Sequence, residues 1–389
     1  MSPREATPAA LDWNRVIARR MERQGLIKPA SRVGPADIAS VMCGAHAQVL
    51  SAAELSIGRR IAGATRADVQ RSLWIDRTLI KTFGPRGTVH LLATRDLPTW
   101  TGALSSLVSS MPKHPDPVLF TPEQADEVIA AIGDALANAE LTVDELTEAI
   151  QERTGPWAVE RTMDAFQDKW PRWRQLTSTA AHRGVLCFGP DRGRNVTYTN
   201  PHRWLPGFQP QDGDTALRSL VTQYLHAYGP ATPHHFARWL AFPPRRSVEL
   251  FDELADEMES ASLDGEPGWI LAGDTAVPRP HRGVRLLPYF DAYVVAAQPR
   301  GRLFPGPAAA RASPSGQAGN YPVLLINGVV GGVWHQRRAG RKLVITVEPL
   351  RELTAVQRRQ LDDEVELVGA VMEAEATLTI GKVTVGPHA

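Results

Sequence analysis

Cysteine and lysine are both scarce in this chain of 389 residues. The two cysteines, Cys43 and Cys187, lie far apart and outside any metal-ligand spacing, so the sequence indicates neither a disulfide framework nor a zinc site. We expect both thiols to be buried like small hydrophobic side chains. Lysine occurs at only six positions, so arginine supplies most of the positive charge.

Long apolar runs and an excess of charge of one sign are also missing. No apolar run approaches the length of a membrane span, and residues 1–20 carry too much charge for a signal peptide, so we expect a cytoplasmic protein that does not engage a membrane. The net charge of +1 excludes a surface that is positive throughout. Any surface that binds a polyanion must therefore be local.

Several catalytic motifs are absent. The chain has no Gly-rich phosphate loop, no Gly-x-Ser-x-Gly, no H-E-x-x-H and no paired Cys-x-x-Cys. An ATPase, a serine hydrolase and a zinc enzyme therefore lack support, and we expect neither a metal nor a cofactor.

The pattern of the chain predicts an α+β protein. The expected helices cover 11–30, 36–42, 51–62 and 66–80, then 122–137, 142–153 and 171–183, then 214–228, 232–240 and 245–260. Each group is followed by strands, at 82–92, 184–199 and 268–271, and this order is typical of a winged helix. We predict three tandem winged helix-turn-helix domains (1–112, 113–208, 209–276) and a C-terminal β-barrel-like domain (277–389).

The C-terminal part has the apolar alternation of strands. The expected elements are strands at 286–297, 323–326, 329–336 and 341–347, a helix at 354–372 and a last strand near 377–384. The Pro- and Gly-rich stretch 299–322 is expected to form a long mobile loop. Asp291 and Tyr293 lie in an apolar run and are expected to form satisfied core hydrogen bonds, while Trp170 and Trp173 are expected in a core.

The stretch 43–60, CGAHAQVLSAAELSIGRR, contains the main candidate site. His46 and Gln48 flank a small residue, and extended backbone would project both side chains the same way. Ser51 and Glu54 have the spacing of a capping box, which predicts a helix directly after this pair. By spacing alone, such a pair most often consists of ordinary polar loop residues.

Four runs carry a family resemblance. GAHAQVLSAAELSIGRR and RSLWIDRTLIKTFGPRGTVHLLATRDLPTW resemble the opening of the bacterial winged-helix family that includes the AlkZ and YcaQ type alkylpurine DNA glycosylases. LLPYFDAYVV and VLLINGVVGGVWHQRRAGRKLVITVEPL resemble its closing part. The family has Gln-x-Gln or Gln-x-Asp where this chain has His46 and Gln48. The resemblance implies a C-shaped arrangement with a concave, basic DNA-binding surface.

The chemistry of such an enzyme suits this pair. A guanine alkylated at N7 is already cationic and leaves as a neutral base, so the enzyme chiefly positions water and stabilises the cation that forms on the sugar. The Gln48 carbonyl oxygen can hold a water. Neutral His46 can act as its general base, or can only position it in place of the family's Gln. We therefore predict His46 and Gln48 as the catalytic pair.

The candidate DNA-binding residues are all basic. They are Arg59 and Arg60 after the motif, Lys81 and Arg86 on the first wing, Arg192 and Arg194 on the second, and Arg337, Arg338, Arg341 and Lys342 at a hairpin tip. Taken singly, each of these residues is more often a solvated surface charge than a DNA contact. The hairpin group is the exception, because four cations on one tight turn suit phosphate contact or groove insertion.

The resemblance and these residues predict a monofunctional DNA glycosylase. Its expected substrate is a bulky or crosslinked N7-alkylguanine in double-stranded DNA, and we expect a monomer. Abundant Ala, Pro and Gly with few lysines are typical of a GC-rich, actinobacterial-type genome. The family that the chain resembles includes resistance enzymes of antibiotic producers, so the resemblance and this composition together imply self-resistance to a genotoxic natural product. Two alternatives remain: a non-catalytic winged-helix DNA-binding regulator, and a general alkylpurine repair glycosylase.

Overall fold

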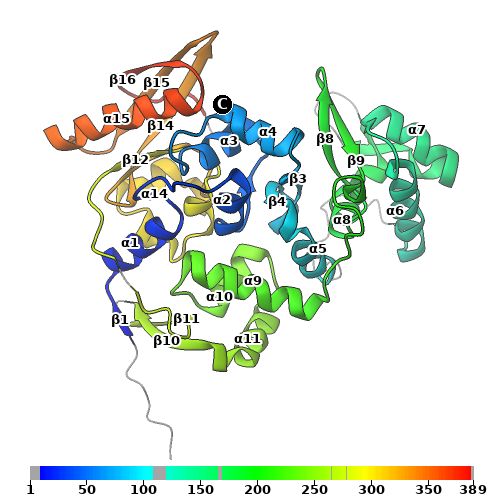
Figure 1. Cartoon of the computed structure of the whole chain (residues 1–389), viewed down its shortest axis with the longest axis horizontal. Helices are drawn as coiled ribbons and strands as arrows, with labels where there is room; N and C mark the ends of the chain where they lie inside the picture. The colour runs from blue at the N-terminus through cyan, green and yellow to red at the C-terminus, as the bar shows by residue number, and fades with distance from the viewer. Residues whose placement is uncertain (1–8, 108–119, 165–168, 264, 277, 387–389) are drawn as a thin grey trace, which may run out of the picture. The chain divides into compact units, whose positions relative to one another are not determined.

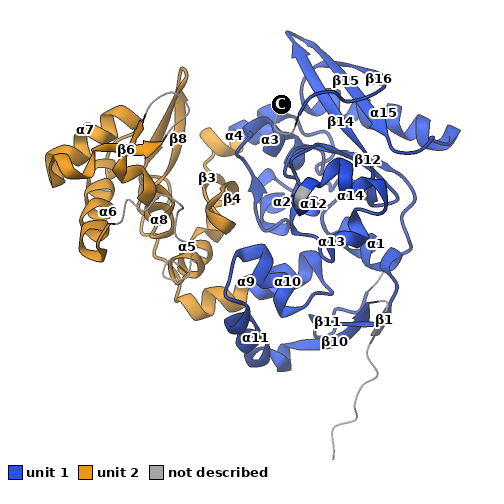
Figure 2. Ribbon diagram, turned by 180° about the vertical axis from the view of Figure 1, so that it is seen from behind, with its two compact units in different colours: residues 1–71, 221–389 blue, residues 72–220 orange. Residues whose placement is uncertain are grey.

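The computed structural model describes residues 9–107, 120–164, 169–263, 265–276 and 278–386 (Figure 1). The chain divides into two compact units (Figure 2). Unit 1 contains residues 1–71 and 221–389, and unit 2 contains residues 72–220. The predicted domain boundaries at 112/113 and 276/277 involve residues outside the described part of the chain, and the division into four domains stays a prediction.

Unit 1 begins with short elements around the candidate site. They are β1 (Ala9–Leu11), α1 (Trp13–Arg23), α2 (Pro35–Val41), β2 (Ala45–His46), α3 (Leu50–Gly58) and α4 (Arg66–Trp74), which runs on into unit 2. Asp12 caps α1 by accepting the Arg15 backbone N–H at 3.0 Å. The helix ends well before residue 30 because the chain turns at Gly25, with φ at +67°.

The second part of unit 1 is a group of three helices with a small sheet. Its elements are α9 (Gly213–Tyr228, which begins in unit 2), α10 (Pro233–Leu240), α11 (Pro244–Glu253), β10 (Met258–Leu263) and β11 (Glu266–Leu271). The helix predicted at 245–260 is therefore too long, since its last residues form β10. The sheet order is β1-β10-β11, with β1 parallel to β10.

The C-terminal part of unit 1 contains a five-stranded sheet with helices. The elements are β12 (Val284–Leu287), α12 (Ala292–Ala296), α13 (Arg300–Leu303), α14 (Pro307–Ala312), β13 (Val323–Ile326), β14 (Val329–Ala339), β15 (Lys342–Pro349), α15 (Ala355–Val371) and β16 (Glu375–Ile380). The strand order follows the sequence, and only β15 and β16 pair in parallel. With β12 and β16 at its edges, this sheet is open.

Two predictions for this region are wrong. The strand expected at 286–297 ends at Leu287, and Asp291 instead caps α12 by accepting the Tyr293 backbone N–H at 3.0 Å. The stretch 299–322 contains α13 and α14, and Leu303, Phe304 and their apolar neighbours are buried. These helices are held by apolar contacts, which Pro and Gly content alone does not reveal.

Helices cover both faces of the five-stranded sheet. On one face, α15 packs through Leu361, Val365 and Val368, and Leu55 of α3 joins this cluster. On the other face, the sheet contacts α1 and the segment that contains α12, α13 and α14. The candidate site is therefore attached to the C-terminal sheet through buried apolar contacts.

Unit 2 combines antiparallel strand pairs with helices. Its elements are β3 (Leu79–Phe83), β4 (Val89–Ala93), α5 (Leu97–Ser105), α6 (Pro122–Leu136), β5 (Leu141–Thr142), α7 (Val143–Thr154), β6 (Arg161–Asp164), β7 (Lys169–Pro171), α8 (Thr177–His182), β8 (Cys187–Arg192) and β9 (Asn195–Thr199). The pairs β3–β4, β6–β7 and β8–β9 are antiparallel. Trp173 is buried in its core, as predicted, but Trp170 is 44% exposed, which contradicts the prediction. The Arg174 guanidinium lies 4.0 Å from the centre of the Trp170 ring.

Both cysteines are buried and reduced, as predicted. Over the described residues, no helix is both long enough and apolar enough to span a membrane. Within the same ranges, no three His, Cys, Asp or Glu side chains gather as a metal site would require.

Candidate active site

A tight turn presents His46. After α2 the backbone takes left-handed conformations at Cys43 (φ +57°) and Gly44 (φ +96°), the second of which favours glycine. The buried Tyr228 hydroxyl donates to the Met42 carbonyl oxygen at 2.7 Å. The turn is thus fixed from outside, and the chain leaves it as the short strand β2, which ends at His46.

His46 and Gln48 differ in their surroundings. His46 is only 8% exposed, whereas Gln48 is an exposed residue in a bend. The sequence predicts extended backbone from His46 through Gln48, which would point both side chains the same way. In the structure the strand ends at His46, so no continuous strand aligns the two side chains. The pair instead offers one largely enclosed imidazole and one solvated amide.

Helix α3 starts without the predicted capping box. Val49 is its N-cap residue, and Ser51 lies inside the first turn. Glu54 faces the interior at 1% exposure, where it accepts a hydrogen bond from Gln70 at 2.8 Å and pairs with Arg66 at 3.2 Å. The capping prediction is wrong because Glu54 holds the start of α4 against α3.

An aromatic residue from the far end of the chain lies on His46. The Phe290 ring stacks on the imidazole with 4.4 Å between ring centres and 24° between ring planes. Phe290 follows β12 in a left-handed conformation (φ +54°), and its backbone N–H donates to the Gly319 carbonyl oxygen at 3.0 Å. Two of the four runs that carry the family resemblance therefore meet at His46.

A fully buried ion pair lies beside this contact. The Arg60 guanidinium donates to both carboxylate oxygens of Asp291, at 2.8 and 2.7 Å, and both side chains are 0% exposed. The Ser56 hydroxyl donates to the same carboxylate at 2.7 Å. Burial alone would raise the pKa of Asp291, but Arg60 and Ser56 together hold it below its usual value. Asp291 is thus a satisfied core group, as predicted.

Arg59 and Arg60 were predicted to contact DNA, and the structure corrects this. Arg59 is 2% exposed and donates to Glu364 of α15 at 2.6 Å. Glu364 also accepts the Leu286 backbone N–H at 2.9 Å. Because both guanidinium groups are enclosed and paired with carboxylates, they join the end of α3 to α15 and to the start of α12, and they have no free face for a phosphate.

The hairpin of β14 and β15 keeps its cations at the surface. Arg337, Arg341 and Lys342 are exposed around a tight turn at Gly340. Arg338 is also exposed, but its guanidinium donates to the Met372 and Gly340 carbonyl oxygens at 2.9 and 3.0 Å. Arg337, Arg341 and Lys342 can therefore contact a phosphate directly, whereas Arg338 would first have to break its hydrogen bonds to the backbone.

The predicted cations of unit 2 are more variable. Arg192 is bound to Glu145, with donor–acceptor distances of 2.9 and 2.6 Å. The Lys81 ammonium lies 4.7 Å from the centre of the Phe188 ring, and burial lowers its pKa. Arg86 is half-buried at the turn between β3 and β4, while Arg194 is exposed between β8 and β9.

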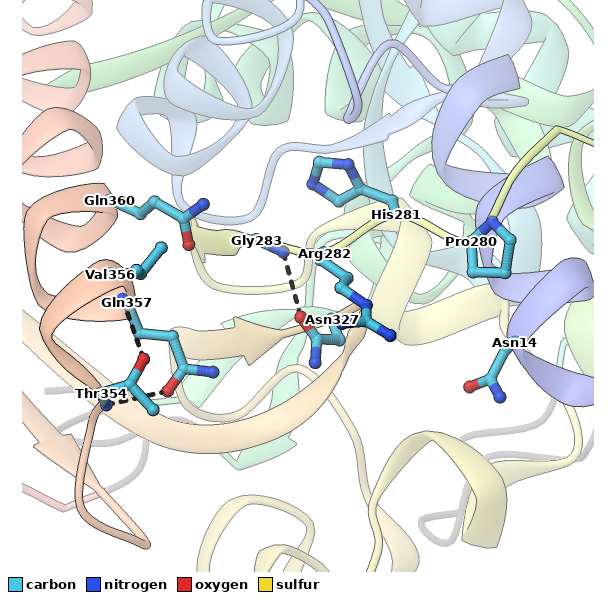
Figure 3. A pocket seen from close by; sticks show the side chains of 10 residues that line it. All are labelled: Asn14, Pro280, His281, Arg282, Gly283, Asn327, Thr354, Val356, Gln357 and Gln360. Carbon is cyan, nitrogen blue, oxygen red and sulfur yellow. Dashed lines mark hydrogen bonds between the residues drawn. The ribbon is translucent and has the colours of Figure 1, made fainter.

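A pocket of about 540 Å³ lies elsewhere in unit 1 (Figure 3). It is lined by Asn14, the segment 280–283, Asn327 and the first residues of α15. Its side chains are mainly polar, and Figure 3 shows the side-chain Oδ1 of Asn327 accepting a hydrogen bond from the Gly283 backbone N–H; the donor–acceptor distance is 3.0 Å. Neither His46 nor Gln48 lines this pocket.

Sequence reasoning missed Phe290 and its support. It treated the run LLPYFDAYVV as one strand, and no periodicity relates residue 290 to residue 46. One signal was present: Pro288 lies inside the run, and a proline in a sequence that otherwise indicates a central strand argues against that assignment. A break there would have placed Phe290 and Asp291 in a turn.

Comparisons with known proteins agree with one another. A family model described as DNA glycosylase AlkZ-like matches residues 39–371. A relative named interstrand DNA cross-link repair glycosylase, from Streptomyces sahachiroi, is 31% identical over 357 residues, which cover 89% of this chain and 93% of the relative. The solved structure of Streptomyces sahachiroi DNA glycosylase AlkZ matches with a TM-score of 0.82 at 28% identity, covering 96% of this chain and 100% of that one. The mixed α+β fold is that of this structure.

Proposed function

The chain belongs to the AlkZ-like DNA glycosylase family, and we propose that it hydrolyses the N-glycosidic bond of a bulky or crosslinked N7-alkylguanine in double-stranded DNA. The observation that carries the proposal is the match over 39–371, which includes the His46 segment, the Phe290 turn and the cationic hairpin. The Streptomyces sahachiroi relative is named for interstrand cross-link repair, which supports a crosslinked substrate.

We propose that His46 and Gln48 together orient the attacking water. The exposed Gln48 carbonyl oxygen can accept from a water and face the cation that develops on the sugar. His46 is mostly enclosed, and its ring plane is set by Phe290, so it can hold the same water at one edge. As neutral imidazole it can also accept the proton that the water loses. The N7-alkylated base leaves neutral without an acid.

We further propose that three winged helices and the β14–β15 hairpin bind the duplex. The support is the order of helices followed by a hairpin, which occurs three times along the chain, ending in β3–β4, β8–β9 and β10–β11. The proposed DNA-contact residues are Arg86, Arg192, Arg194, Lys81, Arg337, Arg338, Arg341 and Lys342. Arg337, Arg341, Lys342 and Arg194 are the stronger candidates because they are exposed, whereas the exposed Arg192 and Arg338 are already bound to Glu145 and to backbone carbonyl oxygens.

The test is base release from duplex DNA that carries a bulky N7-alkylguanine, with abasic sites detected by alkaline cleavage. We expect release by the wild type and loss of at least 100-fold, roughly the contribution of a positioned acid–base group, in His46→Ala and Gln48→Ala. His234→Ala is the matched control, because His234 is an exposed histidine of the same unit. Full activity in a His46→Ala, Gln48→Ala double variant would exclude the proposed pair.

Two further assays separate the alternatives. Equal release of simple methylated purines and bulky adducts would indicate a general alkylpurine repair glycosylase. Tight binding to one defined sequence, with no release from any adduct, would indicate the DNA-binding regulator, which the comparisons with glycosylases do not favour.

We propose that the enzyme acts as a monomer in the cytoplasm for self-resistance, so its expression should protect sensitive cells from a DNA-alkylating natural product.

A further inference from the structure

We propose that Phe290 is a positioning residue for His46, and that the buried Arg60–Asp291 pair holds Phe290 in place. This inference rests on the proposed function, because it assumes that His46 acts in the reaction. Phe290 lies outside the His46–Gln48 segment, and the Arg60–Asp291 ion pair that supports it is fully buried.

The ring contact restricts the imidazole plane. With 4.4 Å between ring centres and planes inclined by only 24°, the two rings are in face contact. The last torsion of a histidine side chain has a broad, roughly two-fold energy profile, so a contact against the ring face narrows the orientations that the imidazole can take. Phe290 closes one face, and the nitrogen atoms at the ring edge keep a fixed direction.

The backbone of Phe290 needs external support. A left-handed conformation (φ +54°) is uncommon for a bulky side chain and persists where neighbouring contacts impose it. The next residue, Asp291, is held by two bonds from Arg60 and one from Ser56. Ser56 belongs to α3, the helix that directly follows the His46 segment, and Arg60 lies just after the C-terminal end of this helix. The positions of the Phe290 and His46 rings are therefore both set by α3 and the residues next to it.

Gly319 leaves the space that the Phe290 ring occupies. A Cβ at Gly319 would lie 2.9 Å from the Phe290 Cδ1 atom and 3.1 Å from its Cα. The Gly319 carbonyl oxygen also accepts the Phe290 backbone N–H. The ring is therefore confined between this segment and His46.

The first experiment compares Phe290→Leu with Phe290→Tyr in the full chain. We expect Phe290→Leu to lower kcat for base release about 10–100-fold, as small misplacements of catalytic groups do, with KM within about twofold. Phe290→Tyr keeps the aromatic face and should restore most of kcat. Phe304→Leu is the matched control, since it removes the same atoms from a buried ring of the same unit and should leave kcat within about twofold.

Proton NMR supplies a readout that does not depend on activity. A ring stacked on an imidazole shifts its C–H resonances upfield, and the His46 signals can be assigned by their absence from His46→Gln. We expect this upfield shift to be lost in Phe290→Leu and kept in Phe290→Tyr and Phe304→Leu. Ser56→Ala, which removes one hydrogen bond to Asp291 and keeps Arg60, should reduce the shift partly.

The results that would overturn the inference are distinct from those that would overturn the function. An unchanged His46 shift in Phe290→Leu, or a rise in KM alone, would show that Phe290 does not position the imidazole. Equal loss of kcat in Phe290→Leu and Phe304→Leu would show a merely structural effect. Absence of base release by the wild type would exclude the proposed function, while the NMR result would still decide whether Phe290 orients His46.

Discussion

Replacing Arg60 with methionine leaves the Asp291 carboxylate enclosed without its cation. Among the described residues, the Ser56 hydroxyl and the Tyr293 backbone N–H still donate to it, at 2.7 and 3.0 Å. Breaking a buried ion pair from one side costs about 3–5 kcal/mol. The folded variant can reduce this cost by protonating Asp291. At pH 7 protonation of a carboxyl with the ordinary pKa of 3.8 itself costs about 4 kcal/mol, from about 1.4 kcal/mol per pH unit.

The pH dependence of this variant has a definite sign. In the wild type the pKa of Asp291 is lowered, so its contribution to stability is present above pH 3.8 and is lost only as the pH falls through the folded-state value. Between pH 5 and pH 7 this group therefore leaves the wild-type stability unchanged. In Arg60→Met burial raises the pKa instead, so the destabilisation should be smaller at pH 5 than at pH 7, by up to about 3 kcal/mol.

The assay is urea unfolding at both pH values, followed by tryptophan fluorescence, since Trp334 is buried in the same unit. The double variant Arg60→Met, Asp291→Leu removes both charges and should recover most of the loss at pH 7, without the added pH dependence. If the single variant lost the same free energy at pH 5 and pH 7, or if the double variant were as unstable as the single one, the reasoning would be refuted.

Three further outcomes are expected. Gly328→Ala should lower the free energy of unfolding by about 2–4 kcal/mol, because the φ of Gly328 is +81° and a Cβ there would lie 2.2 Å from a side chain of α1. Gly340→Ala is the control: its φ is +59° but the space around it is open, so it should cost only about 1 kcal/mol. Equal losses of stability in the two variants would contradict this prediction. Arg337→Gln should lower the salt dependence of DNA binding by about one phosphate contact. Arg338→Gln should lower it by less, because the Arg338 guanidinium is bound to backbone carbonyl oxygens. A larger effect at Arg338 would show that Arg338, and not Arg337, contacts the phosphate. Burial lowers the pKa of His182 to about 4, so its contribution to stability is complete above pH 6.5 and is lost as the pH falls toward 4. In urea unfolding, His182→Gln should therefore reduce the loss of unfolding free energy between pH 6.5 and pH 4 by about 3 kcal/mol. An unchanged pH profile would refute this prediction.

Elements with local signals could be predicted from the sequence. Thr121 and Thr354 each form a capping box with the residue three positions later, and α6 and α15 begin where those signals stand. The hairpins β3–β4 and β8–β9 were also predicted, because a turn containing glycine separates two short apolar runs. In these cases the information lies within a few residues.

Elements defined by distant contacts could not be predicted in this way. The three residues of β1 become a strand only because β10 accepts them as a parallel neighbour. Arg59 and Arg60 stand beside the candidate pair and have the composition of a phosphate site, yet Glu364 and Asp291 take both of them into the interior. The order of residues along the chain does not state which carboxylate an arginine will meet, and so it cannot separate a surface cation from a buried one.

The Arg60–Asp291 contact also sets when this site can form during synthesis. The two residues are 231 positions apart, so at a translation rate of roughly 5–20 residues per second the arginine waits on the order of 10–50 s for its carboxylate. Throughout that interval the His46 segment has neither Phe290 nor Asp291 against it. A nascent chain or an N-terminal fragment that stops before residue 290 therefore contains His46 and Gln48 without the contacts that surround them in the complete protein.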